Sequence, residues 1–143
     1  MTDSDTEYFR RDQKNGVTAP DLTKACTYAE HIVRARGKRT RLTSVSLDRH
    51  KIDDFGPQLY SLARNLADDD GHVFVEHKEL MNNLREIALS SNKKERARAI
   101  QAQRYAKRRL ECLVDWNFQT DSIDRKNIIT WAFESIQKYF RKI

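Results

Sequence analysis

The sequence predicts an all-α fold, a compact bundle of five or six helices, on three observations. Hydrophobic residues make up 38% of the 143 residues and aromatic residues 9%, with only four Gly and two Pro, which indicates a folded chain with a buried core. Charged residues reach 34%, as expected of extensive polar helix faces. Apolar residues recur at helical spacing in most segments. We expect a polar N-terminal arm over residues 1–17 and a single helical domain over residues 18–143.

The first expected helix covers residues 19–36. Thr18 can cap this helix, and Pro20 suits its first turn. Its apolar face combines Leu22, Ala25, Cys26, Ala29, Ile32 and Val33. Gly37 follows as a natural end, and residues 38–46, which are basic and rich in Ser and Thr, are expected to form a loop.

The middle of the chain predicts three shorter helices. The first covers residues 46–56 and ends at a Gly-Pro pair, because proline lacks a backbone N–H and clashes with the preceding turn. The others cover residues 57–67 and about 77–89, separated by an Asp-Asp-Asp-Gly turn. Val73 and Val75 alternate with polar residues too briefly to predict a strand.

Two longer helices are expected in the last third of the chain. Asn92 and Glu95 resemble a capping box, and the helix that they begin runs to about Asp115. Its apolar stripe starts with small alanines, which allow another helix or a partner to approach closely. The last helix covers about 122–141 and is broadly apolar, so we expect it to be largely buried.

Positive charge is concentrated in two segments. Residues 34–51 carry seven bases against one acid, residues 93–109 carry eight against one, and residues 52–92 between them carry eight acids against three bases. Clustered like charges repel one another and are stabilised by a polyanion, whose counterions are released on binding. Arg outnumbers Lys in both segments, and its guanidinium can contact a phosphate with two hydrogen bonds.

We therefore predict a protein that binds nucleic-acid backbones without catalysis. The predicted contacts are Arg34, Arg36, Lys38, Arg39, Arg41, Arg49, Lys51, Lys93, Lys94, Arg96, Arg98, Arg104, Lys107 and Arg108. Only Tyr28 and Tyr105 place an aromatic ring near these bases, so we expect little readout of base identity. The expected partners are nucleic acid and other protein subunits or copies of the same chain.

Three alternatives remain open for the basic surface. It could bind an acidic protein partner as part of a scaffold subunit. It could bind an anionic membrane, although the first half of the basic helix lacks large apolar residues. Residues 58–84 also resemble a helix-turn-helix regulator, although the second helix carries Glu79 and Glu86 and the turn is long.

Enzymatic, metal and cofactor chemistry find little support in the residues. His50 with Asp53 and Asp54 could form an acid-base group, but such spacing arises by chance in any charged helix. His72 and His77 match no zinc signature, and the neighbouring Asp run does not fit a calcium loop. No glycine-rich phosphate loop is present. We expect no enzyme, no metal and no cofactor.

The expected location is the cytoplasm. Cys26 and Cys112 fall on the apolar faces of expected helices, where they are interpreted as reduced core thiols. No apolar run approaches the roughly 18 residues that a membrane span needs. The first residues lack the apolar centre of a secretory signal.

Three stretches resemble the small helical subunit of multisubunit CRISPR effector complexes, especially those of type III. They are YAEHIV (28–33), LTSVSLDRHKI (42–52) and WAFESIQKYFRKI (131–143). The resemblance implies an all-helical, non-catalytic subunit that acts in antiviral defence. Several copies would stack along a ribonucleoprotein and hold the guide or target strand, which favours RNA over DNA. The implied contacts are Arg39, Arg41, Arg49 and Lys51.

Overall fold

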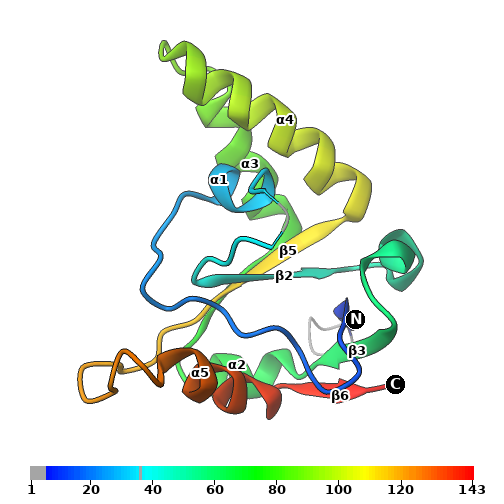
Figure 1. The fold of residues 1–143 in the computed structure, drawn as a ribbon. Helices are drawn as coiled ribbons and strands as arrows, with labels where there is room; N and C mark the ends of the chain where they lie inside the picture. Colours follow the sequence, from blue (N-terminus) through cyan, green and yellow to red (C-terminus); the bar gives the residue numbers. More distant parts are fainter. Residues whose placement is uncertain (1–5, 36) are drawn as a thin grey trace.

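The chain folds around one six-stranded antiparallel sheet, so the predicted all-α helical bundle is wrong. The structure is a computed structural model that describes residues 6–35 and 37–143 (Figure 1). The strands are β1 (Phe9–Asp12), β2 (Leu42–Ser46), β3 (Gln58–Leu62), β4 (Val73–Val75), β5 (Glu111–Asp115) and β6 (Phe140–Lys142), in the order β4-β5-β2-β1-β3-β6. The helices are α1 (Tyr28–Ile32), the 3₁₀ helix η2 (Arg49–Phe55), α2 (Arg64–Asp69), α3 (His77–Ile87), α4 (Lys93–Arg109) and α5 (Ile128–Gln137).

The strands occupy segments that were predicted to be helix, loop or arm. β2 lies in the expected loop, β3 in the expected helix 57–67, and β5 and β6 at the ends of the last two expected helices. With β3 and β4 on either side of α2, residues 58–84 do not form a helix-turn-helix. Each strand has only three to five residues, and β2 and β5 in the middle of the sheet are buried at most positions on both faces. Segments this short hold too few apolar residues for a twofold period to be distinguished from a helical one.

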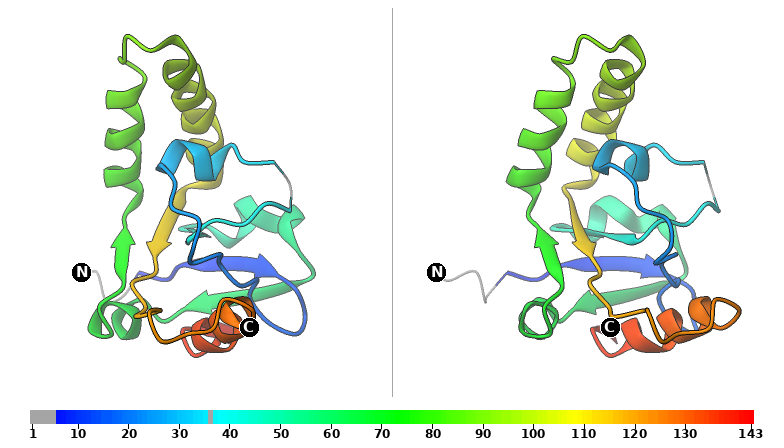
Figure 2. Two further views of the ribbon diagram at one scale, coloured as in Figure 1. Left: turned by 60° about the vertical axis from the view of Figure 1, so that its left-hand side comes forward. Right: turned by 90° about the vertical axis from the view of Figure 1, so that its left-hand side faces the viewer.

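The α3–α4 pair and α5 lie within expected helices, but α4 ends at Arg109 and not near Asp115, and the expected helix over 19–36 is reduced to α1. The Asn92 side chain caps α4 by accepting from the backbone N–H of Glu95 at 3.0 Å, and the C-terminal cap of α4 is Leu110, whose φ is +47°. Helices α3 and α4 form an arm that projects from the sheet (Figures 1 and 2). The buried Ala102 and Ala106 of α4 allow close packing against α3, as the small apolar stripe indicated.

The two faces of the sheet carry separate hydrophobic cores. On β5, Leu113 joins the core beneath α1, α3 and α4, whereas Cys112 and Val114 join the core beneath α2 and α5. This alternation follows from the twofold period of a strand. The second core is the more aromatic and contains Trp116 and Tyr139, both almost fully buried.

Strand β1 lies inside the sheet, although residues 1–17 were predicted to form a polar arm. It pairs with β3 at four positions, but with β2 only at Phe9 and Ser46. Beyond that pair β1 and β2 diverge, and the Arg10 guanidinium donates to the backbone oxygen of Ser44 at 2.8 Å. The separation opens the sheet toward α1, η2 and the end of α4.

Candidate nucleic-acid interface

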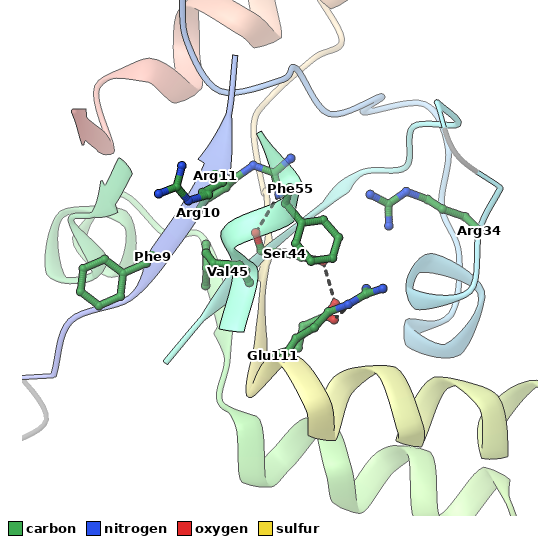
Figure 3. A pocket seen from close by; sticks show the side chains of 10 residues that line it. Phe9, Arg10, Arg11, Arg34, Ser44, Val45, Phe55 and Glu111 are labelled. Carbon is green, nitrogen blue, oxygen red and sulfur yellow. Dashed lines mark hydrogen bonds and ion pairs between the residues drawn. The ribbon is translucent and has the colours of Figure 1, made fainter. Parts of the chain in front are cut away.

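A basic groove lies where β1 and β2 separate. It consists of two adjoining cavities of about 120 and 530 Å³, which share Arg10, Arg34, Phe55 and Arg109. Figure 3 shows the smaller cavity. The walls come from β1, β2, the α1–β2 connection, η2 and the last residue of α4. Segments that are far apart in sequence therefore meet at one concave surface. We call it the β1–β2 groove.

Three arginines line both cavities of the β1–β2 groove, and two of them have carboxylate partners. Arg10 Nε lies 2.8 Å from Asp12 Oδ2 on the same strand. Arg109 Nη1 lies 3.6 Å from Glu111 Oε1, just beyond the end of α4. Neither pairing occupies all the N–H donors of its guanidinium.

Arg34 is the exception among these three arginines. It is half-buried, and among the described residues it forms no ion pair. Its Nε donates to the backbone oxygen of Lys38 at 3.0 Å. Burial, and after it the neighbouring charge of Arg10, lowers the pKa of Arg34. A half-buried guanidinium beside other guanidiniums is a site that an anion would stabilise.

Beneath the groove lies a chain of hydrogen-bonded side chains, of which Thr40, Ser44 and Glu111 line the cavities and His31 does not. His31 Nδ1 lies 2.6 Å from Thr40 Oγ1, His31 Nε2 lies 2.8 Å from Ser44 Oγ, and Ser44 Oγ donates to Glu111 Oε2 at 2.7 Å. Burial lowers the pKa of His31 to about 2, so the ring is neutral at pH 7. Burial raises the pKa of Glu111, and its Oε1 has no hydrogen-bond partner among the described residues.

The order of these side chains differs from that of a nucleophile triad. In a triad the histidine lies between the nucleophile and the acid, and the acid orients the ring. Here Ser44 lies between His31 and Glu111, so the carboxyl group does not touch the ring. The chain of hydrogen bonds instead fixes the floor beneath the three arginines.

Phe55 forms the rim of the groove at the end of η2. The ring is 51% exposed, and the Arg109 guanidinium carbon lies 4.8 Å from its centre. Ile52, on the same 3₁₀ helix, is buried and anchors η2 to the sheet. Gly56 lies so close to β1 that a Cβ atom there would be 2.8 Å from the backbone N and O of Asp12. Phe55 is thus held in place by its neighbours.

The predicted contacts of the first basic segment are divided by the structure. Arg34, Lys38 and Arg39 line the groove. Arg41 is directed elsewhere, since its Nε lies 2.9 Å from Asp115 Oδ1 and its Nη2 donates to the backbone of Trp116.

The remaining residues of that segment are placed as follows. Arg49 and Lys51 are exposed on η2, the same element that carries Phe55. Arg36 lies outside the described residues.

The basic residues of α4 are not brought into the groove as a group. Lys93 and Lys94 lie at the far end of the helix, roughly 24 Å from Arg109 at 1.5 Å per residue. Arg98 approaches Glu30 of α1 at 3.8 Å.

The other α4 bases also lie outside the groove lining. Arg96 donates to the backbone of Ser90 at 3.2 Å. Arg104, Lys107 and Arg108 are exposed near the end of the helix. Within residues 93–109, only Arg109 lines the β1–β2 groove.

Several residues of the groove were not predicted as site residues. Arg10 was assigned to the polar arm, and Phe55 was assigned to the apolar face of a helix. Ser44 and Glu111 became neighbours only because β2 pairs with β5. The one signal in the sequence was the Gly-Pro pair directly after Phe55, which marks a break where a side chain can be exposed.

Comparisons of the chain with protein-family models, with curated proteins and with solved structures found no match. In the part of the chain that the structure describes, no three His, Cys, Asp or Glu residues form a group that could hold a metal ion. No helix among the described residues is both long and apolar enough to cross a bilayer. Cys26 and Cys112 are both free thiols.

Proposed function

We propose that the protein binds the phosphate backbone of a nucleic acid in the β1–β2 groove and catalyses no reaction there. The observation that carries the proposal is Arg34, a half-buried guanidinium with no ion pair among the described residues, which shares the groove with Arg10 and Arg109. Arg34 already donates to the backbone oxygens of Lys38 and His31, so what it lacks is a negative charge. A half-buried charge without a counter-charge is costly, and a phosphate oxygen supplies that charge together with charge-assisted hydrogen bonds.

The length of the basic lining supports a polyanion over a single small anion. Lys38 and Arg39 extend the lining of the larger cavity away from Arg10. Arg49 and Lys51 are exposed on the adjacent η2, but the exposed Asp53 and Asp54 of the same helix balance them, so η2 adds no net charge beyond the rim. Contacts to several successive phosphates release several counterions, which makes binding strong at low salt and steeply salt-dependent.

The proposed setting is a ribonucleoprotein assembly in the cytoplasm. The choice of RNA over DNA, and of an assembly over a lone protein, rests only on the sequence resemblance to a CRISPR effector subunit, whose implied all-helical fold this chain does not have. An acidic protein is the second candidate partner. It would meet the same arginines, but its carboxylates lack the regular phosphate spacing of a strand.

The test is fluorescence anisotropy with labelled 20-nucleotide RNA and DNA strands between 50 and 300 mM NaCl. Arg34→Gln combined with Arg39→Gln removes two charges from the groove, and Lys93→Gln combined with Lys94→Gln removes two charges from the far end of α4. We expect the groove variant to bind at least about tenfold more weakly. Its salt slope should fall by about 1.4, at roughly 0.7 per lost phosphate contact on a single strand.

The α4 double variant serves as the matched control and should stay within about twofold of the wild-type affinity. No binding at 50 mM salt would refute the proposal, as would equal losses in the two double variants. Competition by polyglutamate as strong as competition by an unlabelled strand would favour the acidic protein partner.

A further inference from the structure

We infer that the β1–β2 groove takes a single strand, with an unpaired base stacked on Phe55. This inference rests on the proposed function and specifies the class of nucleic acid. It differs from the sequence-based expectation of backbone contacts alone. That expectation placed only the rings of Tyr28 and Tyr105 near the basic residues.

The first observation is the position of the Phe55 ring. An isolated exposed Phe on a protein surface needs no explanation. Phe55, however, lines both cavities of the groove together with Arg10, Arg34 and Arg109. With half of its surface exposed, the ring offers apolar area at the point where three guanidiniums gather.

The second observation is the pairing of Phe55 with Arg109. The guanidinium carbon lies 4.8 Å from the Phe55 ring centre and 5.1 Å from the Tyr105 ring centre. The Arg109 guanidinium therefore contacts both the Phe55 ring and the Tyr105 ring at the edge of the groove. An aromatic ring beside a guanidinium is the combination that binds a nucleobase by stacking and its phosphate by charge.

The third observation is that the segment carrying Phe55 is held in place by contacts with the rest of the protein. Ile52 is buried, Gly56 touches the backbone of Asp12, and Arg11 Nη1 donates to the Gly56 oxygen at 3.1 Å. These contacts fix both ends of the turn that presents Phe55. Because the ring is already positioned, stacking loses little conformational entropy.

These three observations favour a single strand over a duplex. The bases of a duplex are paired and stacked on one another, so a side chain in contact with its backbone meets no free base face. A single strand can place a phosphate among the arginines and turn its base onto Phe55. Every base has a π-face, so the interaction selects for unpaired bases and not for sequence.

The experiment measures the affinity of the full chain for single-stranded RNA, single-stranded DNA and a duplex of the same sequence. Phe55→Ala should weaken binding to both single strands by about tenfold, which corresponds to about 1.4 kcal/mol, and leave the duplex within about twofold. Phe55→Tyr should restore binding, whereas Phe55→Leu, which keeps the apolar volume but has no ring, should not. Ile129→Ala, which truncates an exposed side chain on α5, is the control.

A strand with abasic sites provides a second readout, because it keeps the phosphates and lacks the bases. The wild-type protein should bind the abasic strand about as weakly as Phe55→Ala binds the intact strand. Phe55→Ala should bind the abasic strand with the same affinity as the wild type. Circular dichroism checks that each variant is folded.

Several outcomes would overturn the inference. The first is that Phe55→Ala loses as much affinity for the duplex as for the single strands. The second is that Phe55→Ala loses no affinity for the single strands. The third is that the wild-type protein binds the abasic strand as tightly as the intact strand. If the arginine double variant loses affinity while Phe55→Ala does not, the proposed function stands and the stacking inference fails. If the wild-type protein binds no strand at all, both fail.

Discussion

Acid should destabilise the protein through His31, and the variant His31→Gln should remove this sensitivity. The ring is fully buried beneath the groove, where Thr40 and Ser44 contact its two nitrogens. Burial, reinforced by the charges of Arg34, Arg10 and Arg109, lowers the pKa of His31 from 6.5 to about 2. The folded protein therefore holds a neutral ring at every pH between these two values.

The size of the effect follows from proton linkage. Below pH 6.5 the unfolded chain binds a proton at His31 that the folded chain rejects, so the free energy of unfolding falls as the pH falls. Well below pH 6.5 the loss is about 1.4 kcal/mol per pH unit, and it sums to about 2.7 kcal/mol between pH 7.5 and 4.5. The raised pKa of Glu111 acts in the opposite direction, since its folded form keeps a proton that the unfolded chain releases as the pH rises.

The assay is urea unfolding followed by tryptophan fluorescence from pH 7.5 to 4.5, using the buried Trp116 as the reporter. Between these limits the wild type should lose about 2.7 kcal/mol more than His31→Gln, whatever the difference at pH 7.5. His50→Gln, an exposed histidine on η2, should follow the wild type. Parallel curves for wild type and His31→Gln would refute the reasoning, as would an NMR titration of the His31 ring within this range.

Three further predictions concern packing, a buried hydrogen bond and thiol reactivity. Gly56→Ala should lose about 3 kcal/mol of unfolding free energy in urea, because its Cβ would meet the Asp12 backbone at 2.8 Å. Gly71→Ala, with open space but a positive φ, should lose only about 1 kcal/mol, and equal losses would contradict the packing argument. Thr43→Val should cost about 1–3 kcal/mol in the same assay, since the buried Trp116 indole N–H donates to Thr43 Oγ1 at 2.8 Å; Thr43→Ser, which keeps the hydroxyl, should cost less. Burial raises the pKa of Cys112 to about 12, so in Cys26→Ser the remaining thiol should react with an aromatic disulfide reagent at pH 8 only after unfolding; rapid reaction of the folded protein would show that this site is open.

The sequence predicted the long helices and missed the sheet for a physical reason. In α3 and α4 the apolar residues repeat over three or more turns, and caps mark the ends, so the local signal is strong. The strands are stabilised by partners far along the chain, as in the pairing of Ser44 with Leu113. The pattern of apolar residues within five positions does not indicate which distant segment will pair with them. Thr43 and Val45 were the β-branched residues that marked β2, and two such residues are too few.

The site was predictable only as a region of charge. Arg34, Lys38 and Arg39 could be selected because like charges cluster along the sequence. Arg10 and Phe55 could not, because only the splayed β1–β2 pair brings them to the first basic segment. Counting charges along the sequence also overstates how much α4 contributes to the groove, because its basic residues point in several directions around the helix axis.

The single pairing between β1 and β2 also bears on how the chain assembles. Strands β2 and β5 pair across at least sixty-five residues, and β3 and β6 across at least seventy-eight. Such high contact order makes folding slow, and the sheet cannot be completed until residue 142 has left the ribosome. The sheet then consists of two half-sheets, β4-β5-β2 and β1-β3-β6, joined at a seam with the groove along it. A nucleic acid bound to both Arg10 and Arg34, as we propose, would connect the two half-sheets across this seam. Hydrogen exchange at Phe9 and Ser46 should therefore slow more on binding than exchange within either half-sheet.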